Sequence, residues 1–210
     1  MTMLKKIQDK ILGVFGDIKI FKWPMFILYH PIGYRVKGED VRKIINTVQA
    51  GDIIIRGYTD YLDGYIIPGI FSHAGLYVGN NNVIHSMADG VFEEDIINFC
   101  RCDKIAILRP RVSAAAKVKA VEIAHKSIGL EYDFAFVTGD NKYYCTELIA
   151  HCYKDTLQKV IRLETATGFW GLVKKENVYL PDGFLDASIN DIIFMNDFAK
   201  KELDKEKNKF

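Results

Sequence analysis

The chain has 210 residues, of which 49% are hydrophobic and 26% are charged, a composition typical of a globular protein with a substantial core. Its 28 Lys and Arg residues balance 27 Asp and Glu residues, giving a formal net charge of +1. Because general binding to nucleic acid depends on concentrated positive charge, this balance argues against a nucleic-acid partner. Four cysteines are too few for a disulfide framework.

The N-terminal residues carry charges too often for a leader peptide. Asp9, Lys10, Asp17 and Lys19 interrupt the apolar positions, so we expect no cleaved signal peptide. No stretch approaches the ~18 consecutive apolar residues of a transmembrane helix. We therefore expect a cytoplasmic protein without stable membrane insertion.

The first elements precede the informative part of the chain. Apolar spacing predicts a helix over residues 3–16. The aromatic-rich segment 21–34 contains two prolines, and we interpret it as an extended segment packed across the core. The alternative is that it forms a wall of the substrate cleft, for an apolar group. A short helix at 37–48 and a buried strand at 52–56 follow.

The pattern of residues 73–87 predicts a β-hairpin. Its predicted loop is Gly79 to Asn81, since glycine and asparagine tolerate left-handed backbone angles. With this three-residue loop, His85 lies opposite Gly75. His73 and His85 then share one face as diagonal neighbours, roughly 7–8 Å apart at the backbone. A two-residue loop would shift the register by one residue and separate the two histidines.

The remaining elements complete an expected single domain over 1–210. They are a strand at 104–109, a helix from Ser113 to about Ser127 stopped by Gly129, a helix from Cys145, an irregular segment with a short helix at 156–180, and a strand at 191–195. The apolar face of the 113–127 helix should contain Ala114, Val118, Val121, Ala124 and Ile128. We expect an N-terminal extension at about 1–48, a catalytic part at 51–155 and a solvated or frayed charged tail at 200–210.

Cys145 begins a predicted helix. The positive end of the helix dipole there lowers the pKa of a thiol and favours the thiolate. The N–H groups of the first turn have no acceptor within the helix and can bind an oxyanion. Cys145, Leu148, Ile149 and Cys152 also follow a helical repeat. A core position is therefore the alternative for Cys145, and packing is our interpretation of Cys152.

A thiol at a helix start and an imidazole on a strand are the parts of a cysteine hydrolase or acyltransferase. His73 is the candidate base, and His85 is the candidate third residue that orients its ring. Glu93 and Glu94 are alternative third residues. We expect no metal site at Cys100 and Cys102, because no second cysteine pair accompanies them.

Four motifs carry a resemblance to a known family. They are Gly51-Asp52-Ile-Ile-Ile, His73-Ala-Gly-Leu-Tyr-Val-Gly, Val83-Ile-His85 and Tyr144-Cys145-Thr-Glu-Leu-Ile. In this order they resemble the permuted papain-like (NlpC-type) amidases of the YiiX/YaeF group. The resemblance implies an α+β fold, papain-like and circularly permuted, with the cysteine helix packed on a small antiparallel barrel-like sheet. Many members carry Glu where this chain has His85, whereas unpermuted NlpC-type peptidases use His.

The expected activity is cleavage of an amide bond in a small peptide or amino-acid conjugate, with cell-wall material as one source of such substrates. It proceeds through a thioacyl-enzyme on Cys145, with no cofactor. Candidate substrate-binding residues are Tyr65, Tyr132 and Tyr144. One alternative is a lipid acyl hydrolase or acyltransferase on the same scaffold. Another is a binding module without catalytic activity.

Overall fold

The computed structural model describes residues 18–20, 27–29, 33–59, 67–134, 136, 141–159, 161, 163–168 and 173–208. The chain divides into two compact units, residues 1–35 and 36–210. In the first unit, β1 (Ile18–Ile20) pairs antiparallel with β2 (Ile27–Tyr29). The helix predicted over 3–16, most of the aromatic segment 21–34 and the candidate Tyr65 lie outside the described residues.

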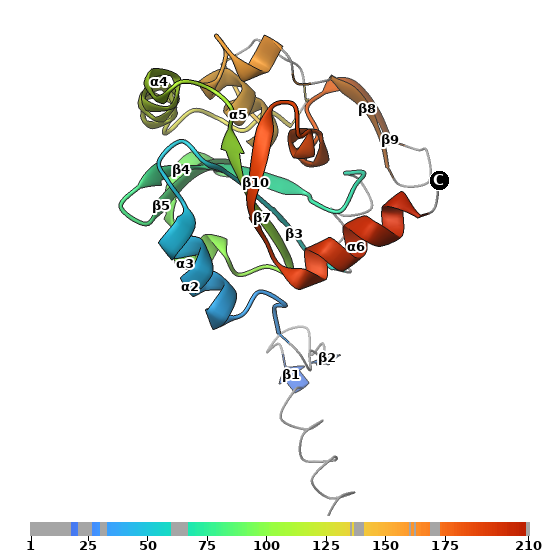
Figure 1. Ribbon diagram of the computed structural model, residues 1–210. Coiled ribbons are helices and arrows are strands. Elements are labelled where there is room, and N and C mark those ends of the chain that lie inside the picture. Colours follow the sequence, from blue (N-terminus) through green and yellow to red (C-terminus); the bar gives the residue numbers. More distant parts are fainter. Residues whose placement is uncertain are drawn as a thin grey trace, which may run out of the picture. The chain divides into compact units, whose positions relative to one another are not determined.

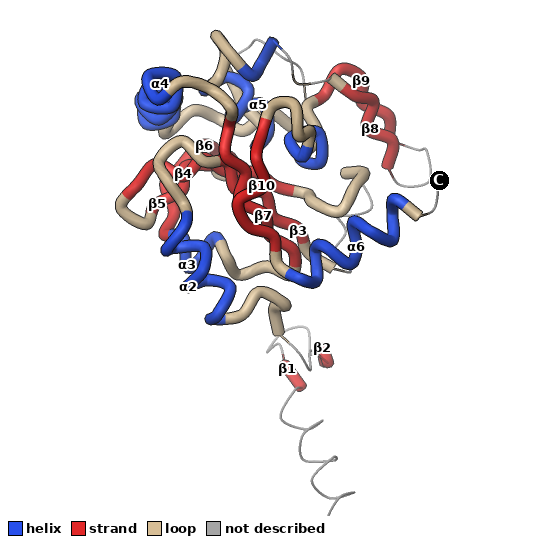
Figure 2. The backbone as a smooth tube through the Cα atoms, in the orientation of Figure 1, coloured by secondary structure: helices blue, strands red, loops and turns tan. Residues whose placement is uncertain are grey.

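The second unit is built on a six-stranded antiparallel sheet in the order β10-β7-β3-β4-β5-β6, drawn in red in Figure 2. Its strands are β3 (Ile53–Gly57), β4 (His73–Gly79), β5 (Asn82–Met87), β6 (Gly90–Asp95), β7 (Lys104–Pro110) and β10 (Asn190–Met195). A separate two-stranded sheet consists of β8 (Glu164–Gly168) and β9 (Val173–Val178). The segment 156–180, predicted as irregular with a short helix, therefore contains a strand pair that the prediction missed.

Helices cover both faces of the six-stranded sheet (Figure 1). They are α2 (Gly38–Thr47), α3 (Ile96–Phe99), α4 (Ala114–Lys126), α5 (Cys145–Cys152) and α6 (Asp197–Lys207), with short 3₁₀ turns at Leu157–Lys159 and Pro181–Leu185. On β3, Ile53 and Ile55 face the core beneath α4 and α5, whereas Ile54 faces the core beneath α2 and α3. Burial on both faces explains the continuous apolar run of this strand. The predicted α+β fold with the cysteine helix on an antiparallel sheet is confirmed.

The β4–β5 hairpin reaches the predicted register by a different route. Asn80 and Asn81 form a two-residue turn with φ of 51° and 62°, so Gly79 pairs with Asn82. The predicted three-residue loop is wrong. A bulge between Tyr77 and Gly79 supplies the extra residue and restores the pairing of Gly75 with His85.

Two further predictions need correction. The charged tail is solvated as predicted, but it is not frayed, because residues up to Lys207 belong to α6 and Leu203 packs against the core shared by α4 and α5. On α4, Val118 is 60% exposed and Ile128, just beyond the helix, is 43% exposed, so neither belongs to the core. The fully buried side chains of α4 are the small residues Ala120 and Ala124, which allow close approach to the sheet.

Gly75 lies where the hairpin has no room for a side chain. An added Cβ would meet Val83 Cγ1 at 2.5 Å and the Phe99 ring at 2.9 Å. We expect Gly75→Ala to lower the free energy of unfolding by about 1–3 kcal/mol, because overpacking forces neighbouring side chains to shift. Chemical denaturation measures this change.

The matched control is Gly38→Ala in α2. There the new Cβ meets only Arg42 Nη1, at an ordinary 3.6 Å. Alanine is also the better helix former, so the stability should be unchanged or slightly higher. An unfolding free energy for Gly75→Ala equal to that of the wild type would contradict this account of the hairpin.

Candidate active site

The hairpin brings the two predicted histidines into contact. Nε2 of His73, at the start of β4, lies 2.9 Å from Nδ1 of His85 on β5. The rings meet edge to face, with centroids 5.1 Å apart. His73 is half-buried and His85 is fully buried. The predicted proximity of these side chains is confirmed.

Both imidazoles are neutral at neutral pH because of their surroundings. Burial and then the Arg56 guanidinium lower the pKa of His85 to about 3. Burial, Arg56 and His85 hold the pKa of His73 well below its ordinary value. The Phe99 ring packs against both, with centroids 5.7 Å from His73 and 5.2 Å from His85. A neutral imidazole is the form that can accept a proton.

Of the two alternative carboxylates, Glu94 reaches the site and Glu93 does not. Oε2 of Glu94, on β6, lies 3.2 Å from Nε2 of His85 and 3.8 Å from Nη1 of Arg56. Neither Oε2 of Glu94 nor Nε2 of His85 makes a hydrogen bond of normal geometry with a described residue, so the approach of these two atoms is an electrostatic contact. Glu93 is exposed and accepts a hydrogen bond from Asn82.

Cys145 is the first residue of α5, as predicted, and it is 6% exposed. Its sulfur lies against the backbone N–H groups of Ala74, the neighbour of His73, and of Thr146. Burial nevertheless raises the pKa of the thiol, and these N–H groups only oppose the rise. The predicted lowering of this pKa is therefore wrong, because desolvation outweighs the helix start. The resting side chain is an uncharged thiol.

Hydrogen bonds to two flanking segments hold the start of α5. The hydroxyl of Tyr144 accepts the N–H of Tyr179 at 2.9 Å, and the hydroxyl of Thr146 donates to the carbonyl of Tyr179 at 2.7 Å. On the other side, the hydroxyl of Ser86 donates to the carbonyl of Tyr143. Tyr144, a candidate substrate-binding residue, is thus buried and bonded to the backbone. These contacts fix the position of Cys145 relative to β4 and β5.

Aromatic rings form a row beside Cys145. Phe136 lies 4.9 Å from Tyr144, and Tyr132 lies 6.4 Å from Phe136 and 4.8 Å from Phe134, measured between centroids. Burial and then the charge of a Cys145 thiolate raise the pKa of Tyr132, which places this candidate residue near the sulfur. Phe134 is 68% exposed, so the row ends at the surface.

The segment before His73 is tied to the 3₁₀ turn that contains Asp182. The two carboxylate oxygens of Asp182 accept the N–H groups of Ile70 and Phe71, at 2.9 and 3.0 Å. Burial raises the pKa of Asp182 to about 6, although these two hydrogen bonds oppose the rise. This carboxylate therefore helps to set where β4 begins.

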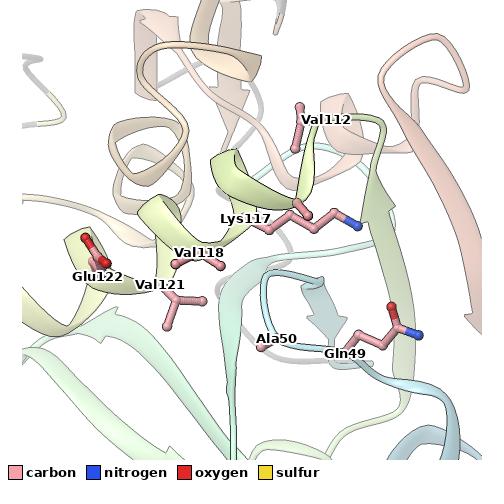
Figure 3. Close-up of a pocket in the computed structure, with 8 residues that line it drawn as sticks. Gln49, Ala50, Val112, Lys117, Val118, Val121 and Glu122 are labelled. Carbon is pink, nitrogen blue, oxygen red and sulfur yellow. The ribbon is translucent and has the colours of Figure 1, made fainter.

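A pocket of about 430 Å³ lies away from these residues, between α4 and the turn before β3 (Figure 3). Its lining includes Val118 and Val121 from α4 and Ala50 from the turn. Neither Cys145 nor His73 contributes to it. The exposed side chain of Val118 lines this pocket, which is not part of the candidate active site.

The comparison with known families decides the classification. Residues 47–179 match the family described as permuted papain-like amidase enzyme, YaeF/YiiX, C92 family. The chain belongs to this family. The family is one of cysteine peptidases and amidases, and the proposed resemblance is confirmed. Family membership favours an enzyme over a binding module without catalytic activity.

The proteins of similar sequence or structure are distant from this chain. Protein OPG091 of Variola virus and that of Vaccinia virus strain Copenhagen are each 27% identical over 111 residues. These matches cover 50% of this chain but only 64% of the relatives, just under two thirds of their length. The crystal structure of metalloprotein YiiX from Escherichia coli O157:H7 has a TM-score of 0.58 and 19% identity, covering 71% of this chain and 98% of that one.

The likeness to YiiX shows the shared fold. Within the ranges that the structure describes, no three His, Cys, Asp or Glu side chains are grouped as ligands for a metal ion. No helix among the same residues is long and apolar enough to cross a membrane.

Sequence reasoning gave Arg56 no place in the site and gave Glu94 a minor one. A signal for Arg56 was present, since it is the charged residue that follows three buried isoleucines in a strand. Glu94 needed the strand β6 to be recognised, and its sequence, Gly90-Val-Phe-Glu-Glu-Asp95, lacks a regular alternation.

Proposed function

We propose that the protein hydrolyses an amide bond in a small peptide or amino-acid conjugate, with Cys145 as nucleophile, His73 as base and His85 as the residue that orients His73. One observation carries the proposal. The sulfur of Cys145 lies against the N–H of Ala74, directly after a histidine that is hydrogen-bonded to a second histidine. Nucleophile, base and orienting group are the parts that such a reaction needs.

The reaction begins with a neutral thiol and a neutral imidazole. His73 takes the proton of Cys145 as the sulfur attacks the carbonyl carbon, and the negative charge moves to the carbonyl oxygen. The N–H of Cys145 belongs to the first turn of α5 and has no acceptor within the helix, so it is suited to stabilise that oxyanion. The C–N bond then breaks, and the leaving amine takes the proton from His73.

A water molecule completes the cycle. His73 accepts a proton from the water as its oxygen attacks the thioester, and the protonated His73 returns a proton to the sulfur as the acid leaves. Because the pKa of Cys145 is raised, proton transfer accompanies the attack instead of preceding it.

The thioacyl-enzyme provides the test. Rapid acid quench of the enzyme with a panel of dipeptide amides, followed by intact and peptide mass spectrometry, should show the mass of the acyl group on Cys145. Hydroxylamine should remove it, as expected for a thioester. Turnover without an acyl group on this cysteine, or acylation of Cys152 instead, would count against the proposal.

A lipid acyl ester is the second candidate substrate, and the aromatic row favours it. Tyr132, Phe134 and Phe136 provide an apolar surface that leads from near Cys145 to the solvent. The same quench with medium-chain acyl esters separates the two candidates. A higher kcat/KM for acyl esters than for peptide amides would select the lipid substrate.

A further inference from the structure

Arg56 carries a buried charge at the centre of the candidate site, and the proposed reaction gives this residue no role. It lies on β3 directly opposite His73, and its side chain is 6% exposed. The guanidinium carbon lies 4.1 Å from the centroid of the Phe99 ring, the ring that also packs against both histidines. Nη1 donates to the carbonyl of Phe99 at 2.9 Å and lies 3.8 Å from Oε2 of Glu94.

The contacts of the two imidazoles form one chain that starts at Glu94. An ionised carboxylate only accepts hydrogen bonds, so Oε2 of Glu94 favours a proton on the facing Nε2 of His85, 3.2 Å away. In a neutral ring Nδ1 of His85 is then an acceptor, and it receives Nε2–H of His73 at 2.9 Å. Nδ1 of His73 is left unprotonated, as a general base requires.

We propose that Arg56 is a positioning residue for the reaction of Cys145: its guanidinium lies beside the Glu94 carboxylate and directs it at His85. Arg56 thereby determines which nitrogen of each imidazole carries the proton. The inference rests on the proposed function for its catalytic consequence, but the tautomers themselves are a property of the resting protein.

The environment of Arg56 supports a role beyond packing. A buried guanidinium is costly unless it is well paired. Here Nε has no hydrogen-bond partner among the described residues, and the ion pair with Glu94 is long. An apolar side chain like those of Ile53 and Ile55 would fill a buried strand position at lower cost. The positive charge of Arg56 is explained by the groups that it faces, which are the Glu94 carboxylate and the two imidazoles.

Two substitutions separate charge from packing. The titratable and charged groups around Arg56 and the imidazoles are Glu94 from β6, Cys145 from α5, and Cys100 and Cys102 beside α3. Arg56→Lys keeps the positive charge among them. Arg56→Met keeps much of the volume and removes the charge, leaving the Glu94 anion to favour an imidazolium.

The pH dependence of kcat/KM is the readout. His73 must be neutral to act as base, so activity is lost as the pH falls through its pKa. We expect the acidic limb to move to higher pH by at least about one unit in Arg56→Met and to stay at the wild-type pH in Arg56→Lys. An unchanged acidic limb in a folded Arg56→Met would overturn the proposal.

A measurement on the wild type keeps the inference testable if Arg56→Met does not fold. In ¹⁵N-histidine-labelled protein near pH 7, the ring nitrogen shifts should show a proton on Nε2 of both His73 and His85. Because this readout needs no substrate, it stands if amide turnover is never found. An Nδ1–H form of either ring would overturn the inference and leave the role of Cys145 untouched.

Discussion

Cys145→Ala is expected to lower the turnover of an amide substrate by at least ~10⁴-fold, because removal of the nucleophile leaves only binding and oxyanion stabilisation. The fold should survive. Cys145 is small and lies at the first position of α5. The helix is held there by hydrogen bonds between the side-chain hydroxyls of Tyr144 and Thr146 and the backbone of Tyr179. Initial rates with purified enzyme, together with thermal unfolding, measure both expectations.

The same helix supplies the control for this prediction. Cys152 is also a buried free thiol, but it is the last residue of α5, at the opposite end of the helix from Cys145. Burial raises the pKa of its thiol to about 12, and the chemistry assigns it no role. Cys152→Ala should retain activity. Loss of activity in Cys152→Ala with full activity in Cys145→Ala would refute the assignment of the nucleophile.

His73→Ala should reduce kcat/KM by about 10²–10⁴-fold, the range expected for loss of a general base. The thiol of Cys145 has a raised pKa, so without His73 little thiolate forms at neutral pH. Alkylation of Cys145 by iodoacetamide should slow in parallel. Both rates are measured across pH 5 to 9.

An exposed histidine serves as the control. His125 lies on the outer side of α4, and His125→Ala should leave turnover and alkylation unchanged. If His73→Ala and the wild type alkylate Cys145 at the same rate and hydrolyse the amide equally well, His73 is not the base.

Local patterns were sufficient for several elements of the second unit. The N-cap of α4 is Ser113, whose side chain accepts the N–H of Ala116, and Gly129 has a φ of +88° just after the helix. Capping and turn residues act within a few positions of the chain, so they can be read without the fold. The start of α5 at Cys145 was predictable for the same reason.

The contacts of the site depended on pairings between distant segments. The bulge between Tyr77 and Gly79 decided whether His73 and His85 meet, and Asn80-Asn81 alone favoured a register that separates them. Glu94 reaches the candidate site because β6 pairs with β5. Arg56 reaches it because β3 pairs with the other edge of β4.

The sequence by itself determined the family, the hairpin, the cysteine helix and the candidate site residues Cys145, His73 and His85, because motif spacing and capping are local. Only the tertiary structure decided the protonation of these groups. Burial gives Cys145 a raised pKa and both histidines lowered ones, against the local expectation for the thiol. Desolvation depends on every chain segment that covers a side chain, so it exists only once the sheet and its helices are assembled.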